Sequence, residues 1–193
     1  MLSVTLYPSS LLVLLFIWHE SFTLPVTTKE PVTDTCVLYA EALLDNIADA
    51  LNPDNLFKGI NCTQQSVDLN TKTDTLSACA PHGTSCSGVE KSEFNQELCM
   101  QNIGEDLDHY YKFLSAHPDP EKFLGNIVLS GLRDFMKNCF SWTSPEDFNK
   151  SPSESPSRYD ERLSLCKKLK GFQIRTITIN RALGYMRSGE HNK

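Results

Sequence analysis

The last long stretch of the chain, residues 158–187, is the feature that most limits how the chain can fold. Apolar side chains recur along it at alternating steps of four and three residues, which is the spacing of one helix face. The positions of this stripe are Leu165, Leu169, Phe172, Thr176, Ile179, Leu183 and Met186. The stripe predicts a helix of about eight turns that packs along its length in a bundle core.

The opposite side of the same predicted helix is also unusual. At about 100° per residue, Ile174, Ile177, Arg181 and Tyr185 cluster there, where a surface helix is normally polar. Tyrosine and arginine are enriched among the residues that dominate protein–protein interfaces. We therefore expect two buried faces, one for the protein's own core and one for another protein. The alternative is a helix buried on both sides within its own domain.

Length and charge restrict the class of protein. The 193 residues are enough for one domain with one core. The formal net charge of −6 argues against general nucleic-acid binding. Residues 158–187 carry eight Lys or Arg against two acidic residues, so the rest of the chain is acidic. This distribution favours steering toward an acidic protein partner, with internal charge balance as the alternative.

The N-terminus carries an uncharged apolar run at residues 11–18. The run is too short to span a bilayer and has the length of a signal-peptide core. Small polar residues follow it, and we place cleavage near Thr23. Residues 1–23 are therefore predicted to be a signal peptide, and residues 24–193 a single secreted, extracellular domain without a membrane anchor.

Helical periodicity and breaking residues predict four helices, at about 35–51, 92–115, 120–140 and 158–187. The second and third are joined by about five residues, which reach at most about 17 Å, so these helices must be antiparallel neighbours. The other two connections, of about 40 and 17 residues, can run back along a whole helix. This long, short, long pattern predicts an all-α, up-up-down-down four-helix bundle.

Cysteines and glycosylation sequons fit a secreted chain. The number of cysteines is odd, so a disulfide framework leaves one thiol free or bridged to another chain. Asn61-Cys62-Thr63 is an N-glycosylation sequon whose middle residue is a cysteine, so a disulfide there would compete with the glycan. A second sequon begins at Asn149 and is weakened by the proline that follows it. The seven cysteines are Cys36, Cys62, Cys79, Cys86, Cys99, Cys139 and Cys166.

The sequence contains little that suggests catalysis or metal binding. It has no glycine-rich phosphate loop, no nucleophile elbow and no paired histidines at metal spacing. Cys79, His82 and Cys86 lie close enough to hold zinc, but disulfide pairing is the favoured fate of these cysteines. A charged cluster that includes Asp106 and His109 is expected on the solvated side of its helix. We predict no enzyme activity, no cofactor and no metal.

Short motifs connect the chain to a known family. Residues 165–185 read LCKKLKGFQIRTITINRALGY, with Leu-Cys, Phe-x-Ile-Arg and Thr-Ile-x-Arg elements, and residues 99–110 read CMQNIGEDLDHY. Leu24-Pro25-Val26 and the pairs Cys62-Thr63 and Ala78-Cys79 add to the likeness. The chain resembles the interleukin-12 alpha subunit family, within the interleukin-6/interleukin-12 group of long-chain helical cytokines. The resemblance covers most of the chain after residue 23 and is most specific in the last helix.

The resemblance implies a secreted cytokine subunit that does not signal alone. It implies pairing with a receptor-like beta subunit built of immunoglobulin-like and fibronectin-like domains. The resulting heterodimer would bind cell-surface cytokine receptor chains and drive T-cell and NK-cell responses. On the last helix, Arg181 matches the family's arginine that enters an acidic pocket of the beta subunit, and Tyr185 matches a contact position. Ile174 and Ile177 lie on the same face.

The resemblance also implies disulfide pairs, which by position are Cys36–Cys86, Cys62–Cys166 and Cys79–Cys99. Cys139 has no counterpart and is expected to be either an inert thiol or the source of an interchain bond. The family's interchain cysteine falls between the positions of Cys79 and Cys86 and is missing here. Whether the heterodimer is covalent is therefore left open.

Two other functions fit a secreted helical chain. One is another helical cytokine, heterodimeric or monomeric; the apolar face around Arg181 argues against a monomer. The other is a helical lipid carrier, which would need a hollow between its helices. The regular apolar stripes instead suggest a filled core.

Overall fold

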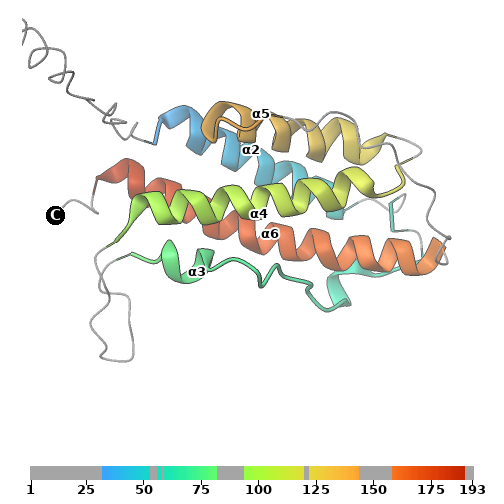
Figure 1. The fold of residues 1–193 in the computed structure, drawn as a ribbon. Helices are drawn as coiled ribbons and strands as arrows, with labels where there is room; N and C mark the ends of the chain where they lie inside the picture. Colours follow the sequence, from blue (N-terminus) through green and yellow to red (C-terminus); the bar gives the residue numbers. More distant parts are fainter. Residues whose placement is uncertain are drawn as a thin grey trace, which may run out of the picture. The chain divides into compact units, whose positions relative to one another are not determined.

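Helices make up the regular structure of the residues that the structure describes (Figure 1). The computed structural model describes residues 32–52, 56–57, 59–81, 94–119, 122–143 and 158–189, all within the unit Pro31–Lys193. No strand occurs among them, as the predicted all-α class requires. None of the described helices is both long and apolar enough to cross a membrane. The elements are α2 (Asp34–Leu51), η1 (Cys62–Gln64), α3 (Thr75–Ala78), α4 (Gln96–Ala116), η2 (Gly125–Leu129), α5 (Ser130–Cys139) and α6 (Arg158–Ser188).

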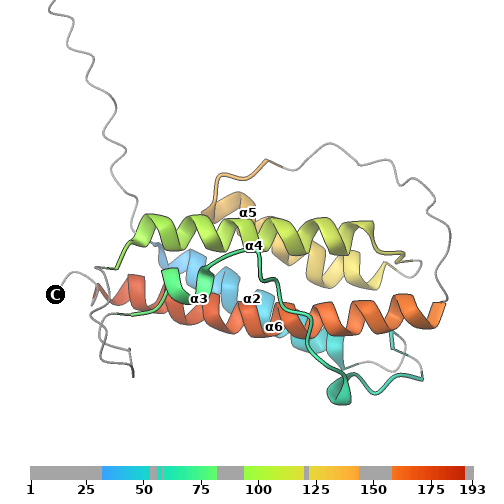
Figure 2. The same cartoon turned by 60° about the horizontal axis from the view of Figure 1, so that its bottom comes forward.

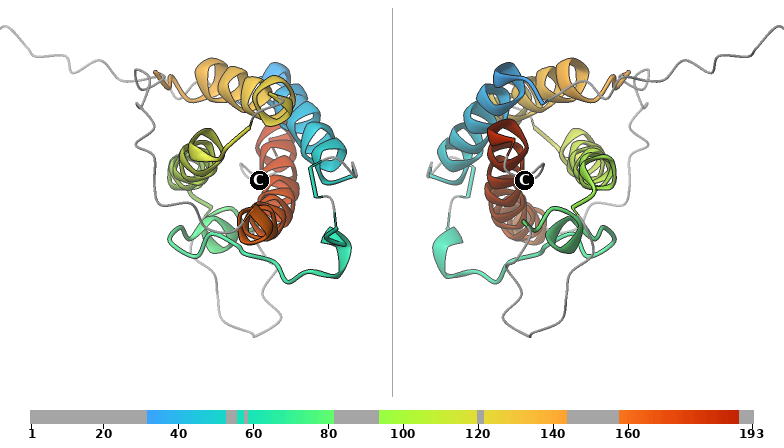
Figure 3. Two further views of the ribbon diagram at one scale, coloured as in Figure 1. Left: turned by 90° about the vertical axis from the view of Figure 1, so that its right-hand side faces the viewer. Right: turned by 90° about the vertical axis from the view of Figure 1, so that its left-hand side faces the viewer.

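The long helices pack in antiparallel pairs, with α6 between α2 and α4 (Figure 3). The start of α2 contacts the ends of two helices: Cys36 bridges to Cys139 of α5, and Asp34 lies 3.6 Å from the Arg187 guanidinium of α6. The ring of Phe94, just before α4, meets the ring of Tyr185 near the end of α6, with centroids 5.2 Å apart. Each contact joins the beginning of one segment to the end of another.

The core forms where the helices face one another. All seven positions of the predicted stripe on α6 are buried, which confirms that face. The stacked rings of Tyr110 on α4 and Phe172 on α6, with centroids 4.3 Å apart, lie in the middle of this core. Dispersion contacts and removal of apolar surface from water make such a face the main stabilising element of a bundle.

Side-chain caps decide where two of the helices begin. Thr33 accepts a hydrogen bond from the Cys36 amide at the start of α2. Asn95 accepts one from the Leu98 amide, 3.0 Å away, so α4 begins at Gln96 rather than at the predicted residue 92. A cap of this kind satisfies one of the backbone donors that the first helical turn leaves unpaired.

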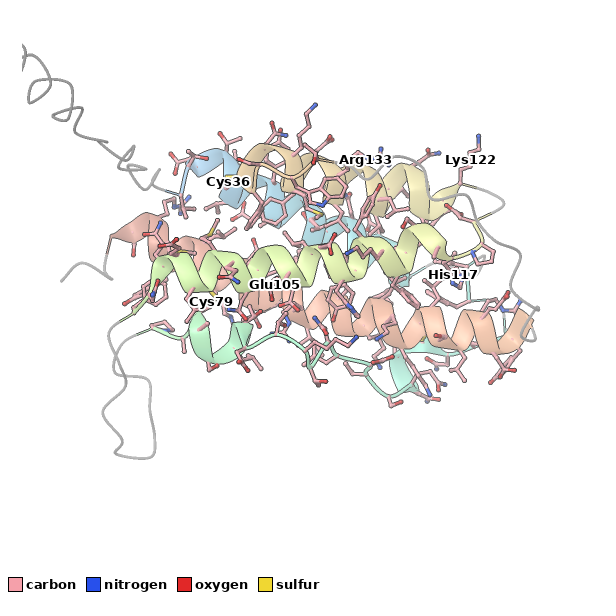
Figure 4. All side chains as sticks on the ribbon, viewed as in Figure 1. Cys36, Cys79, Glu105, His117, Lys122 and Arg133 are labelled. Atoms are coloured by element: carbon pink, nitrogen blue, oxygen red, sulfur yellow. A yellow bond between two sulfur atoms is a disulfide. The ribbon has the colours of Figure 1, made fainter. Side chains whose placement is uncertain are left out.

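The third helix differs from the prediction of a regular helix over 120–140. It is helical from Phe123, passes through the π-helical turn η2, and becomes regular only in α5. The Asp119 carboxylate accepts hydrogen bonds from the amides of Phe123 and Gly125, at 2.9 and 2.7 Å, and so caps this entry. Figure 4 shows His117 and Lys122 on the two sides of the short connection.

Three disulfides hold the described chain together. Cys62–Cys166 and Cys79–Cys99 coincide with pairs that the resemblance implied. The third joins Cys36 to Cys139, so the expected Cys36–Cys86 bridge and the unpaired Cys139 are both wrong. The reason is the antiparallel packing of α2 on α5, which brings these two cysteines to a Cα separation of 5.8 Å. Figure 4 labels Cys36 at the start of α2 and Cys79 beside α4.

Candidate functional site

A segment of the first crossover lies across the outer side of α6 (Figure 2). We call residues 63–74 the strap. The Lys170 ammonium of α6 donates to the carbonyl oxygens of Thr63, at 3.0 Å, and of Gln65. The Asp68 amide donates to the Lys167 carbonyl, also at 3.0 Å. The strap therefore follows the N-terminal half of α6 and covers it from outside.

Gly171 makes this close approach possible. A Cβ atom at this position would lie 2.0 Å from the carbonyl oxygen of Asp68 and 3.2 Å from the Cα of Leu69. Both are backbone atoms, so they cannot swing aside as a flexible side chain would. Only glycine allows the strap to lie this close to the helix.

The far end of the strap is held by a buried carboxylate on α4. Asp106 is fully buried, and its Oδ1 accepts from Asn70 Nδ2 at 2.8 Å and from Thr73 Oγ1 at 2.7 Å. Its Oδ2 accepts from the Thr75 hydroxyl and lies 3.0 Å from Arg175 Nε. Three hydrogen-bond donors and the Arg175 cation thus compensate one charge, as a buried carboxylate requires.

Arg175 completes this cluster from α6. Its guanidinium donates through Nη2 to the Asn70 carbonyl at 2.6 Å, while Nε contacts Asp106 as an ion pair without hydrogen-bond alignment. Arg175 is 3% exposed. The prediction that Asp106 faces solvent is therefore wrong: α3 and the strap cover that side of α4. The concentration of Asn and Thr side chains at 70–75 was one sequence signal for such a buried acceptor.

The same region shifts the pKa values of two neighbouring side chains. Burial lowers the pKa of His109, and the nearby ammonium groups of Lys168 and Lys72 lower it further. Burial also raises the pKa of Tyr110, whose hydroxyl accepts a hydrogen bond from the Asn70 amide at 3.2 Å. Both shifts favour the neutral form, as desolvation dictates.

Beyond the strap, the C-terminal half of α6 is open on its outer side. We call Ile174, Ile177, Arg181 and Tyr185 the α6 face. Ile174 is 43% exposed, Arg181 is exposed, and Ile177 and Tyr185 are partly exposed. Within the described parts of the chain, no hydrogen bond or ion pair engages the Arg181 guanidinium. The structure thus brings the four predicted contact residues together on one open surface.

Arg181 differs from three other basic residues of α6, which contacts within the protein hold in place. Lys168 is paired with Asp68, Lys170 is held by two strap carbonyls, and Arg175 is buried against Asp106. Arg181 instead presents an unengaged fork of donors among apolar side chains. Such a group can bind a carboxylate through two parallel hydrogen bonds.

The other sites considered from the sequence are the two glycosylation sequons and a possible zinc site. Asn61 is exposed at the start of η1, whereas Asn149 lies outside the described residues. Of the three residues considered for zinc, Cys79 is bridged to Cys99, and His82 and Cys86 also lie outside the described residues.

A surface cavity of about 240 Å³ lies between the end of α2, η1 and α6, with Lys170 and Gln173 in its wall. It is smaller than a typical pocket of about 300–1,000 Å³ for a drug-sized ligand, and part of its wall is polar. This cavity gives no support to the lipid-carrier alternative.

Comparison with known proteins places this bundle in a family. A sequence model described as "Interleukin-12 alpha subunit" matches residues 5–189. Interleukin-12 subunit alpha of Homo sapiens is 29% identical over 195 residues, covering 84% of this chain and 88% of that protein. The Canis lupus familiaris protein of the same name is 28% identical over 203 residues, covering 89% of each, and the Sus scrofa protein is 26% identical over 197 residues, covering 86% and 87%. The chain belongs to the interleukin-12 alpha subunit family and is a cytokine subunit, not an enzyme.

Proposed function

We propose that the protein forms a heterodimer with a receptor-like beta subunit and that the α6 face is the surface it buries. The observation that carries this proposal is the exposed, unengaged guanidinium of Arg181 among Ile174, Ile177 and Tyr185. Arginine and tyrosine framed by apolar contacts are typical of interface hot spots. A protein without a permanent partner would gain nothing from keeping this surface apolar.

The partner chemistry follows from the charge and from the resemblance. An acidic pocket on the beta subunit would receive Arg181, since a planar guanidinium matches a carboxylate bidentately. The strap limits this surface at its N-terminal side, so the contact extends from Ile174 toward the end of α6. Tyr185, already in edge-to-face contact with Phe94, supplies a rigid apolar wall beside the arginine.

The bridges change which cysteine is available for a covalent link. Six of the seven cysteines are used by Cys36–Cys139, Cys62–Cys166 and Cys79–Cys99. The remaining one is Cys86, which lies outside the described residues. If the beta subunit is held covalently, the bond is therefore made by Cys86 and not by Cys139.

Secretion and receptor binding complete the proposal. Three disulfides are typical of a protein that matures in an oxidising compartment, which supports the predicted signal peptide at residues 1–23. The assembled heterodimer would then bind cell-surface cytokine receptor chains on T cells and NK cells. This last part depends on the family membership alone.

The test is the affinity of the Arg181→Ala variant for the beta subunit, measured after co-expression in vertebrate cells. Loss of a hot-spot arginine should weaken binding by at least about 2 kcal/mol, or about 30-fold, with unchanged helical content. Arg133→Ala is the matched control, because Arg133 is exposed on α5, away from the α6 face. Equal affinities for all three proteins would place the interface elsewhere.

Non-reducing and reducing gels of the same secreted material show whether a disulfide links the two subunits. A complex that survives without reductant, and disappears with reductant or in Cys86→Ser, shows a bond through Cys86. A complex seen only by native sizing shows that the α6 face holds the pair without a bond. No complex under any condition would contradict the heterodimer and favour a monomeric cytokine.

A further inference from the structure

We infer that Asn61 carries an N-linked glycan and that the glycan is attached before the neighbouring Cys62–Cys166 bridge closes. The inference rests on the proposed secretory route. Asn61-Cys62-Thr63 satisfies the Asn-x-Thr acceptor pattern. The structure adds two observations that the pattern alone does not provide: the geometry of the asparagine amide, and the position of the bridge partner in the chain.

The folded geometry leaves the acceptor atom accessible. Asn61 and Thr63 are exposed, whereas Cys62 between them is buried. The Asn61 Oδ1 accepts from the Thr63 hydroxyl at 2.6 Å and from the Thr63 amide at 3.2 Å. No hydrogen bond among the described residues uses Nδ2 of Asn61, the atom to which a glycan is joined. Glycan attachment therefore breaks no contact of the folded chain.

The chemical step needs a lipid-diphosphate-linked oligosaccharide as the donor. Nδ2 of Asn61 attacks C1 of the first sugar, so that a C1–N bond forms. The C1–O bond to the diphosphate breaks, and the lipid diphosphate leaves. The amide nitrogen gives up one proton, and no oxidant or reductant takes part.

The bridge would interfere with this step if it formed first. Cys62 is tied by its disulfide to Cys166 on α6, and Lys170 holds the carbonyl of Thr63. Both contacts fix the sequon against a helix and would keep it from entering the active site of a transferase. A sequon whose Cys62 is not yet bridged to Cys166 has no such restriction.

The order of synthesis resolves this conflict. Cys166 lies 104 residues after Cys62. At about 5–20 residues per second, about 5–20 s pass between the synthesis of the two cysteines. During that interval α6 does not exist, so the sequon cannot be held by it. Glycosylation during synthesis therefore precedes closure of the native bridge.

The glycan would lie on the strap side of the α6 face, closer to Ile174 than to Arg181. The sequon contacts α6 at Lys170, and Lys170 is eleven residues before Arg181. At 1.5 Å per residue this is about 16 Å along the helix. A glycan at Asn61 would thus mark the limit of the partner-binding surface on the side of the strap.

The experiment is site-resolved glycan mapping on the full chain expressed with its beta subunit in vertebrate cells. Enzymatic release of N-glycans converts the modified Asn to Asp, which mass spectrometry detects separately at 61 and at 149. We expect conversion at 61 in wild type and in Thr63→Ser, and none in Thr63→Ala. Lysate and medium are both analysed, so glycan occupancy is also measured for a chain that fails to pair or to be secreted. An unmodified Asn61 in both fractions overturns the inference.

A separate variant tests whether the glycan is attached before the Cys62–Cys166 bridge closes. Cys166→Ser removes the bridge partner without touching the sequon. If the glycan is attached first, occupancy at Asn61 in the lysate stays at the wild-type level. An increase in occupancy in this variant would show that the bridge competes with the glycan, and would overturn the order proposed here.

Discussion

Arg175 of α6 and Asp106 of α4 form an ion pair, with Nε 3.0 Å from Oδ2 and both side chains almost completely buried. The pair joins two helices, and through Asn70, Thr73 and Thr75 it also joins both of them to the strap and the start of α3. It therefore fixes the first crossover to the bundle at a point where no disulfide acts.

Removing one member of this pair should be costly. We expect Arg175→Met to lower the free energy of unfolding by about 3–5 kcal/mol, because Asp106 would keep a buried charge without its counter-ion. The double variant with Asp106→Asn should lose much less than the sum of the two single losses, since it leaves no lone charge. Lys168→Met is the control: its ion pair with Asp68 is partly exposed and should contribute about 0–1 kcal/mol. Urea unfolding of the wild type, the two single variants and the double variant measures the coupling, with Lys168→Met unfolded beside them, and additive losses would contradict it.

Gly171 and Gly184 offer a matched comparison within α6. Gly171→Ala should destabilise the protein by about 1–3 kcal/mol, because its Cβ collides with the backbone of the strap. Gly184→Ala has no atom within 4 Å of the new Cβ and should stabilise the helix by up to about 1 kcal/mol. Thermal unfolding gives the sign of both changes. Hydrogen exchange at the Asp68 amide should become faster only in Gly171→Ala, and equal exchange in both variants would argue against the contact.

The thiol count distinguishes the observed bridges from the expected ones. Protein that is not covalently linked to the beta subunit should, when denatured and unreduced, take up one maleimide per chain, and peptide mapping should place it on Cys86. If Cys36–Cys86 were the true pair, the label would appear on Cys139 instead. Labelling of Cys139 would therefore contradict the Cys36–Cys139 bridge.

The depressed pKa of His109 gives the protein a stability that depends on pH. The unfolded histidine keeps its ordinary pKa near 6.5, so below that pH the unfolded state binds more protons than the folded state. Stability is therefore present above pH 6.5 and is lost as the pH falls toward the folded pKa. We expect His109→Gln to flatten this decrease in urea titrations between about pH 7 and about pH 5. The charged groups near His109 are Lys168, Lys72, Asp106 and Asp68. If His109→Gln leaves the dependence of stability on pH unchanged, these groups rather than the histidine determine it.

Periodicity predicted those parts of the fold that depend on apolar faces. The α6 stripe, including Thr176, is buried as expected, and the short connection correctly predicted α4 and α5 as neighbours. The π turn at Gly125–Leu129 was not predictable in this way, because its residues fit an ordinary apolar helix pattern equally well.

The polar cluster and the bridges were predicted less well, because they depend on tertiary packing. Asp106 was expected on the solvated side of its helix, but it lies three residues after Ile103 and four before Tyr110, and the strap, α3 and Arg175 bury its carboxylate. The pairing of Cys36 followed the family pattern in the sequence, whereas the extra Cys139 takes that partner in the structure. The four residues of the α6 face could be placed together from sequence, since one helix carries them all.

The three disulfides also decide what happens when the backbone is cut. Cys36–Cys139 ties α2 to α5, Cys62–Cys166 ties the crossover to α6, and Cys79–Cys99 ties it to α4. A single protease cut in any connection between the four helices separates two fragments that still share at least one of these bonds. The two fragments would stay linked until a reductant is added, so one cut in such a connection cannot by itself release a helix from this cytokine subunit.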